Sequence, residues 1–257
     1  MSQDAWDPAQ YARFRAERRQ PFYDLLALVQ PVARGRVVDL GCGTGELTVE
    51  LHRHTKAAAT LGIDHSPAML ESAARLARPG IAFAQDDIAS FTPDAPVDIV
   101  FSNAALQWVP DHESLFTRLA TFLVEGGQLA VQMPANHDHA SHVIADATAQ
   151  EEPFRSAAGG EPRSWPVLAP EAYATLLDRL GFRSPLVRLQ VYVHHLGSRE
   201  DVVEWVKGTY LTYYRARFGD ALYEAYLHRY RERLMDALPD ERPYVYTYKR
   251  LLLWARR

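Results

Sequence analysis

The sequence predicts an α/β fold with a doubly wound, mostly parallel sheet. Short apolar runs alternate with helical patterns through the first half of the 257-residue chain. This alternation is typical of repeated βαβ units, whose right-handed crossovers place helices on both faces of a sheet. A second observation is the glycine-rich turn Gly41-Cys42-Gly43-Thr44-Gly45, which follows the first apolar run directly. An open α/β sheet binds its ligands at such turns.

The elements of the first half follow one another in a regular order. Apolar runs predict strands at 36–40, 60–64, 81–87, 97–103 and 127–134. Helical spacing of apolar residues predicts helices at 45–54, 66–77 and 112–123. The second helix has a clear beginning, because Ser66 is a good N-cap and Pro67 fits the first helical position.

The second half has a different pattern. Residues 134–169 are rich in His, Pro, Ala and Gly, and are expected to form an irregular connection. A helix at 170–182, ended by Gly181, and a half-exposed strand at 186–196 follow. Residues 200–238 are expected to be helical, and 248–257 to form a final strand.

Composition excludes several classes of protein. The net charge of −4 provides no basic field for nucleic acid or an anionic membrane. A single cysteine, Cys42, allows no disulfide framework within the chain. The N-terminus lacks the apolar core of a signal peptide, and no run reaches the roughly 18 apolar residues of a membrane span. We expect a cytoplasmic protein with a small-molecule partner, without nucleic acid or membrane partners, that is a monomer or a weak homodimer.

The glycine turn is spaced G-x-G-x-G and is followed by Glu46, whereas a dinucleotide site needs G-x-G-x-x-G. An acid in place of the third glycine disfavours a pyrophosphate and favours a ligand with a positive centre. Asp64, which ends the second strand, can accept hydrogen bonds from two ribose hydroxyls. Asp87 can accept from an adenine amino group, and Asp39 can face an ammonium or orient the loop. Together they predict a site for an adenosine that carries a cationic amino acid.

These residues resemble the S-adenosylmethionine-dependent methyltransferases of the Rossmann-like fold. The resemblance rests on Asp39–Gly45, on Gly62-Ile63-Asp64 and on Asp87-Ile88. It implies S-adenosyl-L-methionine as cofactor, S-adenosyl-L-homocysteine as product, and a seven-stranded sheet whose last strand, 249–255, is antiparallel. The implied cofactor-binding residues are Asp39, Gly41, Cys42, Gly43, Gly45, Asp64, His65, Met69, Asp87, Ile88 and Asn103.

A closer resemblance, through most of the chain up to Thr209, is to the trans-aconitate 2-methyltransferases. It is carried by the stretches AWDPAQYARFRAERRQP, SNAALQWVPDHESLF, LAVQMPANHDHASH and VVEWVKGT. It implies a single methyltransferase domain over 1–257, with a helical lid at 1–30, a cofactor-binding core at 31–134 and a helical substrate roof at 197–240. The sequence departs from the family at Thr212, where an arginine is expected, and this change concerns the acid and not the methyl donor.

The expected activity is O-methylation of one carboxylate of a small polycarboxylic acid such as trans-aconitate. A carboxylate is ionised at neutral pH and needs no general base, so no catalytic side chain is expected to be essential. No metal is expected, because the spacing of His137, His139 and His142 matches no recognised ligand pattern. Gln107 and Trp108 are expected to position the reactants. The expected substrate-binding residues are Trp6, Tyr11, Arg18, Gln107, Trp108, His137 and His142. Further cationic candidates are Lys207, Arg242, Lys249 and Arg250.

Three alternatives remain open on the sequence. The substrate can be a different small acid or a natural product, which Thr212 and the tyrosines of 210–230 favour. An NAD-dependent oxidoreductase is disfavoured by Glu46 and by the lack of a group that would assist hydride transfer. A cofactor-binding regulatory module without turnover is the third.

Overall fold

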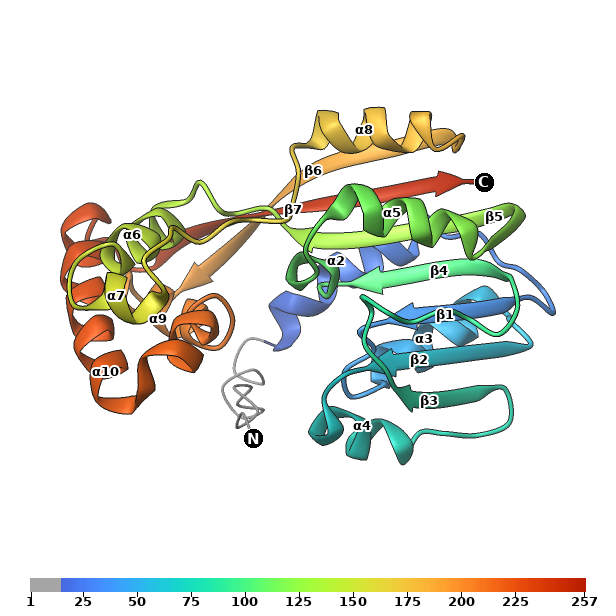
Figure 1. The fold of residues 1–257 in the computed structure, drawn as a ribbon, viewed down its shortest axis with the longest axis horizontal. Helices are drawn as coiled ribbons and strands as arrows, with labels where there is room; N and C mark the ends of the chain where they lie inside the picture. Colours follow the sequence, from blue (N-terminus) through green and yellow to red (C-terminus); the bar gives the residue numbers. More distant parts are fainter. Residues whose placement is uncertain (1–14) are drawn as a thin grey trace. The chain divides into compact units, whose positions relative to one another are not determined.

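The computed structural model describes residues 15–257, and their side chains from Arg19 onward (Figure 1). The chain divides into two compact units. The sheet unit comprises Arg19–Ala135, Trp165–Gln190 and Lys249–Arg257, and the helical unit includes Asn136–Ser164 and Val191–Tyr248. No helix in the described part of the chain is long and apolar enough to cross a bilayer.

The sheet has seven strands in the order β3-β2-β1-β4-β5-β7-β6. The strands are β1 (Arg36–Leu40), β2 (Ala59–Asp64), β3 (Ile81–Gln85), β4 (Val97–Asn103), β5 (Leu123–Pro134), β6 (Arg183–Leu196) and β7 (Tyr244–Arg256). The first five are parallel, and β7 runs antiparallel to β5, with Gln132 opposite Leu252. The predicted seven-stranded, mostly parallel sheet and its antiparallel last strand are therefore confirmed. The carboxyl ends of β1, β2, β3 and β4 meet at one edge, which is where such sheets bind ligands.

Helices cover both faces of the sheet unit. They are α2 (Arg15–Leu26), α3 (Glu46–Thr55), α4 (Pro67–Ala74), α5 (His112–Thr121) and α8 (Pro170–Arg179), with a short 3-10 helix η1 (Leu106–Trp108). Phe22 and Leu25 of α2 pack with Phe101 of β4 and Leu252 of β7 in one apolar core. The other core contains residues of α5 and α8 and the opposite face of the same strands. Apolar residues on both faces explain why these strands read as continuous apolar runs.

The helical unit contains α6 (Ala140–Ala149), α7 (Phe154–Ala158), α9 (Glu200–Lys207) and α10 (Thr212–Ala237), the last interrupted by Gly219. The prediction of an irregular connection over 134–169 was wrong, because two helices form there. Tertiary contacts stabilise them: the hydroxyls of Tyr226 and Tyr230 donate to the backbone oxygens of Ala145 and Ser141. These partners lie 81 and 89 residues away along the chain, so no local pattern reveals them.

The other predicted elements are confirmed, and most of their ends shift by one to four residues. Ser66 caps α4 by accepting a hydrogen bond from the backbone N–H of Met69, with Pro67 at the first position. Gly181, with φ of 78°, follows the end of α8. The predicted helix at 200–238 is present as α9 and α10, and the last strand begins earlier than expected, at Tyr244.

The tyrosine contacts of α10 predict a stability difference. Tyr230→Phe removes a buried hydrogen bond to the Ser141 oxygen and should lower the free energy of unfolding by about 1 kcal/mol. Tyr213→Phe is the matched control, since the Tyr213 hydroxyl has no hydrogen bond among the described residues, and it should change stability by less than about 0.5 kcal/mol. Urea unfolding of both variants measures the difference. Equal losses would show that the Tyr230 hydroxyl does not fasten α6 to α10.

Candidate functional site

The glycine turn joins the end of β1 to the start of α3. Gly41, Gly43 and Gly45 have φ values of 80°, 55° and 78°, in the left-handed region that favours glycine. Gly45 is the N-cap of α3 and provides no side-chain cap. The first backbone N–H groups of α3 therefore have no capping side chain, and a helix begins with a partial positive charge at this point.

The three glycines serve different purposes. A Cβ atom at Gly41 would lie 2.2 Å from the Cβ of Ala105, and one at Gly45 would lie 2.7 Å from the ring of Phe83. A Cβ at Gly43 would meet no atom of the described residues within 4 Å. Close packing within the protein thus explains Gly41 and Gly45, whereas only Gly43 borders open space that a ligand can fill. The turn therefore leaves room at its centre for the cofactor that the sequence implies.

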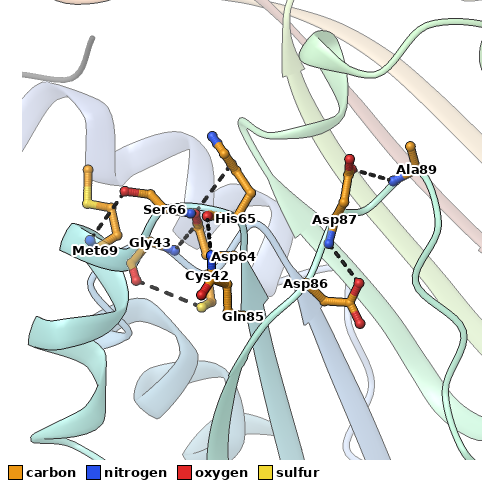
Figure 2. Close-up of polar contacts among 10 residues, drawn as sticks. All are labelled: Cys42, Gly43, Asp64, His65, Ser66, Met69, Gln85, Asp86, Asp87 and Ala89. Carbon is orange, nitrogen blue, oxygen red and sulfur yellow. Dashed lines mark hydrogen bonds and ion pairs between the residues drawn. The ribbon is translucent and has the colours of Figure 1, made fainter. Parts of the chain in front are cut away.

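Asp64 holds this turn in place. Its two carboxylate oxygens accept hydrogen bonds from the backbone N–H groups of Gly43 and Ser66, each at 2.9 Å (Figure 2). The neighbouring His65 ring lies 3.6 Å from the same carboxylate and is largely exposed. Each carboxylate oxygen has a second lone pair, so Asp64 can still accept from a ribose hydroxyl. Asp64 thus has a structural role in the turn, which the sequence did not reveal.

Asp39, near the end of β1, is a buried carboxylate. It is 4% exposed, and the Thr48 hydroxyl donates to it at 2.6 Å. Burial raises the pKa of Asp39 to about 7, the Thr48 hydrogen bond opposes this, and the charge of Asp64 adds to it. A nearby cation would favour the ionised form, and therefore the electrostatics fit a cationic ligand. Cys42 is different, since burial raises the pKa of its thiol and leaves it protonated at neutral pH.

The segment after β3 presents Asp87 and Ile88. Figure 2 shows Asp87 beside Asp86 and Ala89, where its carboxylate accepts a hydrogen bond from the Ala89 N–H at 2.9 Å. Asp87 is exposed and Ile88 is half-buried. Arg118 of α5 donates to the backbone oxygens of Ile88 and Phe91, and these hydrogen bonds hold the segment against α5. Met69, on α4, is half-buried at the same edge of the sheet. These positions suit an adenine ring held between apolar side chains.

Residues 103–108, at the end of β4 and through η1, carry no charged side chain. Gln107 is 7% exposed, and its Nε2 donates to the Ala104 oxygen at 2.7 Å. Buried oxygens of Asn103 and Gln107 have no hydrogen-bond partner among the described residues. Trp108, next to Gln107, is 42% exposed and lies on the surface of η1. The structure therefore separates the two expected positioning residues into a buried amide and an exposed indole.

The helical unit contains the two expected histidines. His137 is exposed, whereas His142 is 4% exposed. The His142 ring packs against the edge of Tyr210 at 4.2 Å between centroids, and its Nδ1 lies 3.0 Å from the Ser141 hydroxyl. Burial is the main cause that lowers the pKa of His142 well below its usual value, so this ring is neutral. Tyr210 and Tyr214 both donate to Asp146, at 2.6 and 2.5 Å.

Three expected substrate-binding residues, Trp6, Tyr11 and Arg18, lie outside the residues whose side chains are described. Within the described part of the chain, no group of three or more His, Cys, Asp and Glu is arranged to hold a metal ion.

Two polar residues were missed by the sequence analysis. Gln132 of β5 is fully buried, and neither atom of its carboxamide has a partner among the described residues. A glutamine among the apolar residues of a predicted strand was the signal that could have identified Gln132. Arg163 lies over the rings of Tyr210 and Tyr213, at 4.4 and 4.2 Å from their centroids. Its segment had been read as irregular, so no pattern linked it to the tyrosines.

Comparison with known proteins gives consistent matches. Residues 37–127 match the family described as a methyltransferase domain. The chain is 44% identical to the trans-aconitate 2-methyltransferase of Deinococcus radiodurans, with 98% of each chain covered. It is 42% identical to the trans-aconitate 2-methyltransferase of Methylobacterium nodulans, again over 98% of each.

Solved structures support the fold. An S-adenosylmethionine-dependent methyltransferase from Mesorhizobium loti is 23% identical, with a TM-score of 0.51, and the match covers 93% of this chain and 98% of that chain. The YcgJ protein of Bacillus subtilis is 14% identical, with a TM-score of 0.61, over 93% and 98% of the two chains.

The glycine geometry predicts that two similar substitutions have different effects. Both Gly41→Ala and Gly43→Ala impose a left-handed conformation that costs about 1–2 kcal/mol. Gly41→Ala also forces a contact with Ala105, which should add about 1–3 kcal/mol. We expect Gly43→Ala to remain folded and to lose affinity for S-adenosylhomocysteine, measured by calorimetry. If folded Gly43→Ala binds S-adenosylhomocysteine with unchanged affinity, the open space at Gly43 is not part of the cofactor site.

The raised pKa of Asp39 predicts a pH-dependent affinity. A cationic ligand favours ionised Asp39, so the affinity for S-adenosylhomocysteine should rise with pH until it levels off above about 7. Without ligand, the free energy of unfolding should change in the opposite direction. Because the pKa of Asp39 is raised, the folded state keeps a proton that the unfolded state loses, so this group makes the protein less stable as the pH rises from the unfolded pKa to about 7. Asp39→Asn should bind more weakly and without this pH step. Calorimetry between pH 5.5 and 8 measures both proteins, and an identical slope in the variant would contradict the assignment.

Proposed function

We propose that this chain, which belongs to the family of trans-aconitate 2-methyltransferases, esterifies one carboxylate of trans-aconitate. The observation that carries the proposal is the 44% identity over 98% of the chain to the enzyme of Deinococcus radiodurans. At this level the cofactor turn, the helical unit and the last strands are all included in the match. The methyl donor of the family is S-adenosylmethionine.

The cofactor site that we propose is built from the ends of β1, β2 and β3. Gly43 leaves room for the amino-acid part, and the N-terminus of α3 presents N–H groups to its carboxylate. Asp39 faces the ammonium, Asp64 the ribose, and Asp87 with Ile88 the adenine. When bound, S-adenosylmethionine supplies a methyl group on a positively charged sulfur. The remaining task of the protein is to orient the acceptor and exclude water.

The side chains after β4 suit this task. Asn103, Gln107 and Trp108 offer amide and indole groups, none of which takes up a proton at neutral pH. A carboxylate acceptor is already ionised and requires no base. Alignment of the acceptor oxygen with the methyl group can supply roughly 7–11 kcal/mol of the barrier. The hydrogen bond from Gln107 Nε2 to the Ala104 oxygen orients this amide, and the second hydrogen of Nε2 can be donated to the acceptor.

Recognition of a polyanion requires cationic groups. Arg18, on the N-terminal segment, is proposed for this role, and its side chain lies outside the described residues. Arg163 is a further candidate, because its guanidinium stacks on the rings of Tyr210 and Tyr213 and donates to the backbone oxygen of Tyr210. These two tyrosines flank Leu211 and Thr212, the segment where the family's arginine was expected. Arg163 therefore offers a guanidinium to the turn that lacks one.

A second candidate substrate is a different small acid, and Thr212 is the observation that favours it. Thr212 is the first residue of α10, and its hydroxyl donates to the Thr209 oxygen. A threonine engaged with its own backbone contributes no charge to an acid. A substrate with fewer carboxylates than trans-aconitate would need fewer cationic partners.

The test is transfer of an isotope-labelled methyl group from S-adenosylmethionine to a panel of di- and tricarboxylic acids. We expect trans-aconitate to be methylated with the highest kcat/KM. Thr212→Arg should keep that activity or shift the preference further toward tricarboxylates, by about 1–2 kcal/mol for one new charged hydrogen bond. No labelled ester with any acid, in a protein that binds S-adenosylhomocysteine, would contradict the proposed function. A dicarboxylate preferred by the unsubstituted protein would favour the second candidate.

A further inference from the structure

Gln132 presents a feature that folding alone does not explain. It lies near the carboxyl end of β5, is 0% exposed, and has no hydrogen-bond partner for Nε2 or Oε1 among the described residues. An amide buried without partners costs about 1–3 kcal/mol relative to an apolar side chain of similar shape. Such a group in a native protein calls for a partner, which is either an ordered water or a bound ligand.

The register partners of Gln132 carry no negative charge. Asn103 of β4 is its register partner on one side, and Leu252 of β7 on the other. Arg250, which is 6% exposed, lies two residues along β7 from Leu252 and so points to the same face. Diagonal cross-strand neighbours are within reach of long side chains. This face at the strand ends therefore offers amide donors and a guanidinium.

On β5 and β7 this face carries no acid near Gln132, and Asp39, on the same face, lies two strands away on β1. On β5 and β7 the positions that share this face are Ala130, Gln132, Pro134, Arg250, Leu252 and Trp254. Ala130 and Leu252 belong to the core beneath α2, which identifies the face. A carboxylate that binds at the ends of these strands would meet donors without like-charge repulsion.

The position of Gln132 in the sheet separates it from the cofactor. Most of the proposed cofactor residues follow β1, β2 and β3, and Asn103 ends β4, whereas β5 lies two strands from β1. Two strand spacings are about 10 Å. Gln132 therefore lies on the side of the methyl acceptor, beyond Asn103.

We infer that Gln132 is an acceptor-binding residue that donates its Nε2–H to a carboxylate of the methyl acceptor, with Arg250 as the neighbouring cation. This inference rests on the proposed function for the identity of the acceptor, and it adds a specific recognition contact. Occupation of the site converts a buried unpaired amide into one with a charged partner. The amide at 132 thus contributes to affinity for the acid and reduces the stability of the free protein.

The chain offers a matched control in Gln128. This residue lies on the same strand and the same face as Gln132 and is 2% exposed, but both atoms of its carboxamide are hydrogen-bonded. It accepts from the Gln30 N–H at 2.8 Å and from the Trp254 ring at 3.1 Å, and it donates to the Gln30 oxygen at 2.9 Å. A leucine at either position removes a buried amide of the same size, but only the one at 128 breaks existing hydrogen bonds.

The experiment measures binding of trans-aconitate to the protein saturated with S-adenosylhomocysteine, in which no methyl can be transferred. Gln132→Leu should raise the Kd for trans-aconitate by about tenfold to a hundredfold, keep the affinity for S-adenosylhomocysteine, and leave the midpoint of urea unfolding unchanged or higher. Gln128→Leu should lower that midpoint and keep the Kd for trans-aconitate. The KM for the acid should follow the Kd in turnover assays.

Each other outcome has a definite meaning. An unchanged Kd for trans-aconitate in Gln132→Leu overturns the inference and leaves the proposed function intact. A loss of S-adenosylhomocysteine affinity with unchanged acid binding also overturns it and moves the amide to the cofactor. If the unsubstituted protein binds and methylates other acids but not trans-aconitate, the proposed substrate fails, and the same variants are then compared with the acid that is methylated.

Discussion

The carboxylate of Asp64 joins the two loops on which the cofactor site depends. Its oxygens accept from the N–H of Gly43 in the glycine turn and from that of Ser66 at the start of α4, each at 2.9 Å (Figure 2). These contacts fix the turn after β1 relative to the end of β2. The open space at Gly43, the uncapped start of α3 and the depth of Asp39 all follow from where that turn lies. One side chain thus fixes the turn after β1 and the start of α4 in one arrangement.

The site combines charges that would repel one another in the absence of ligand. Asp39 and Asp64 are close enough for the charge of Asp64 to contribute to the raised pKa of Asp39. In the proposed site, a cationic ligand would offset this repulsion, which is a cost already present in the folded protein. The buried amide of Gln132 follows the same principle on the acceptor side. Functional groups of this kind lower stability and gain their partners only on binding.

The helical unit shows how strongly distant contacts can determine local structure. Residues 140–149 contain four alanines and several polar residues, and their pattern alone suggested a connection. Hydrogen bonds from Tyr226 and Tyr230, together with ion pairs from Arg229 and Arg233 to Glu151, hold this segment against α10. Weak local preferences give way when a long partner helix supplies the missing contacts. The tyrosines of α10 are thus largely explained by packing and by carbonyl partners.

The sequence by itself determined the sheet of the first half, the antiparallel last strand expected from the family, and the glycine turn with Asp39, Asp64 and Asp87 at the strand ends. These features depend on short-range patterns and on parallel strands that place their carboxyl ends together. Only the tertiary structure decided that Gly43 alone of the three glycines borders open space, that Asp64 fastens the turn, and that α6 and α7 form. It also decided that Gln132 is buried without a partner while Gln128, on the same strand, is paired. Each of these depends on atoms brought together from residues far apart in the chain, and no local pattern of residue types contains that information.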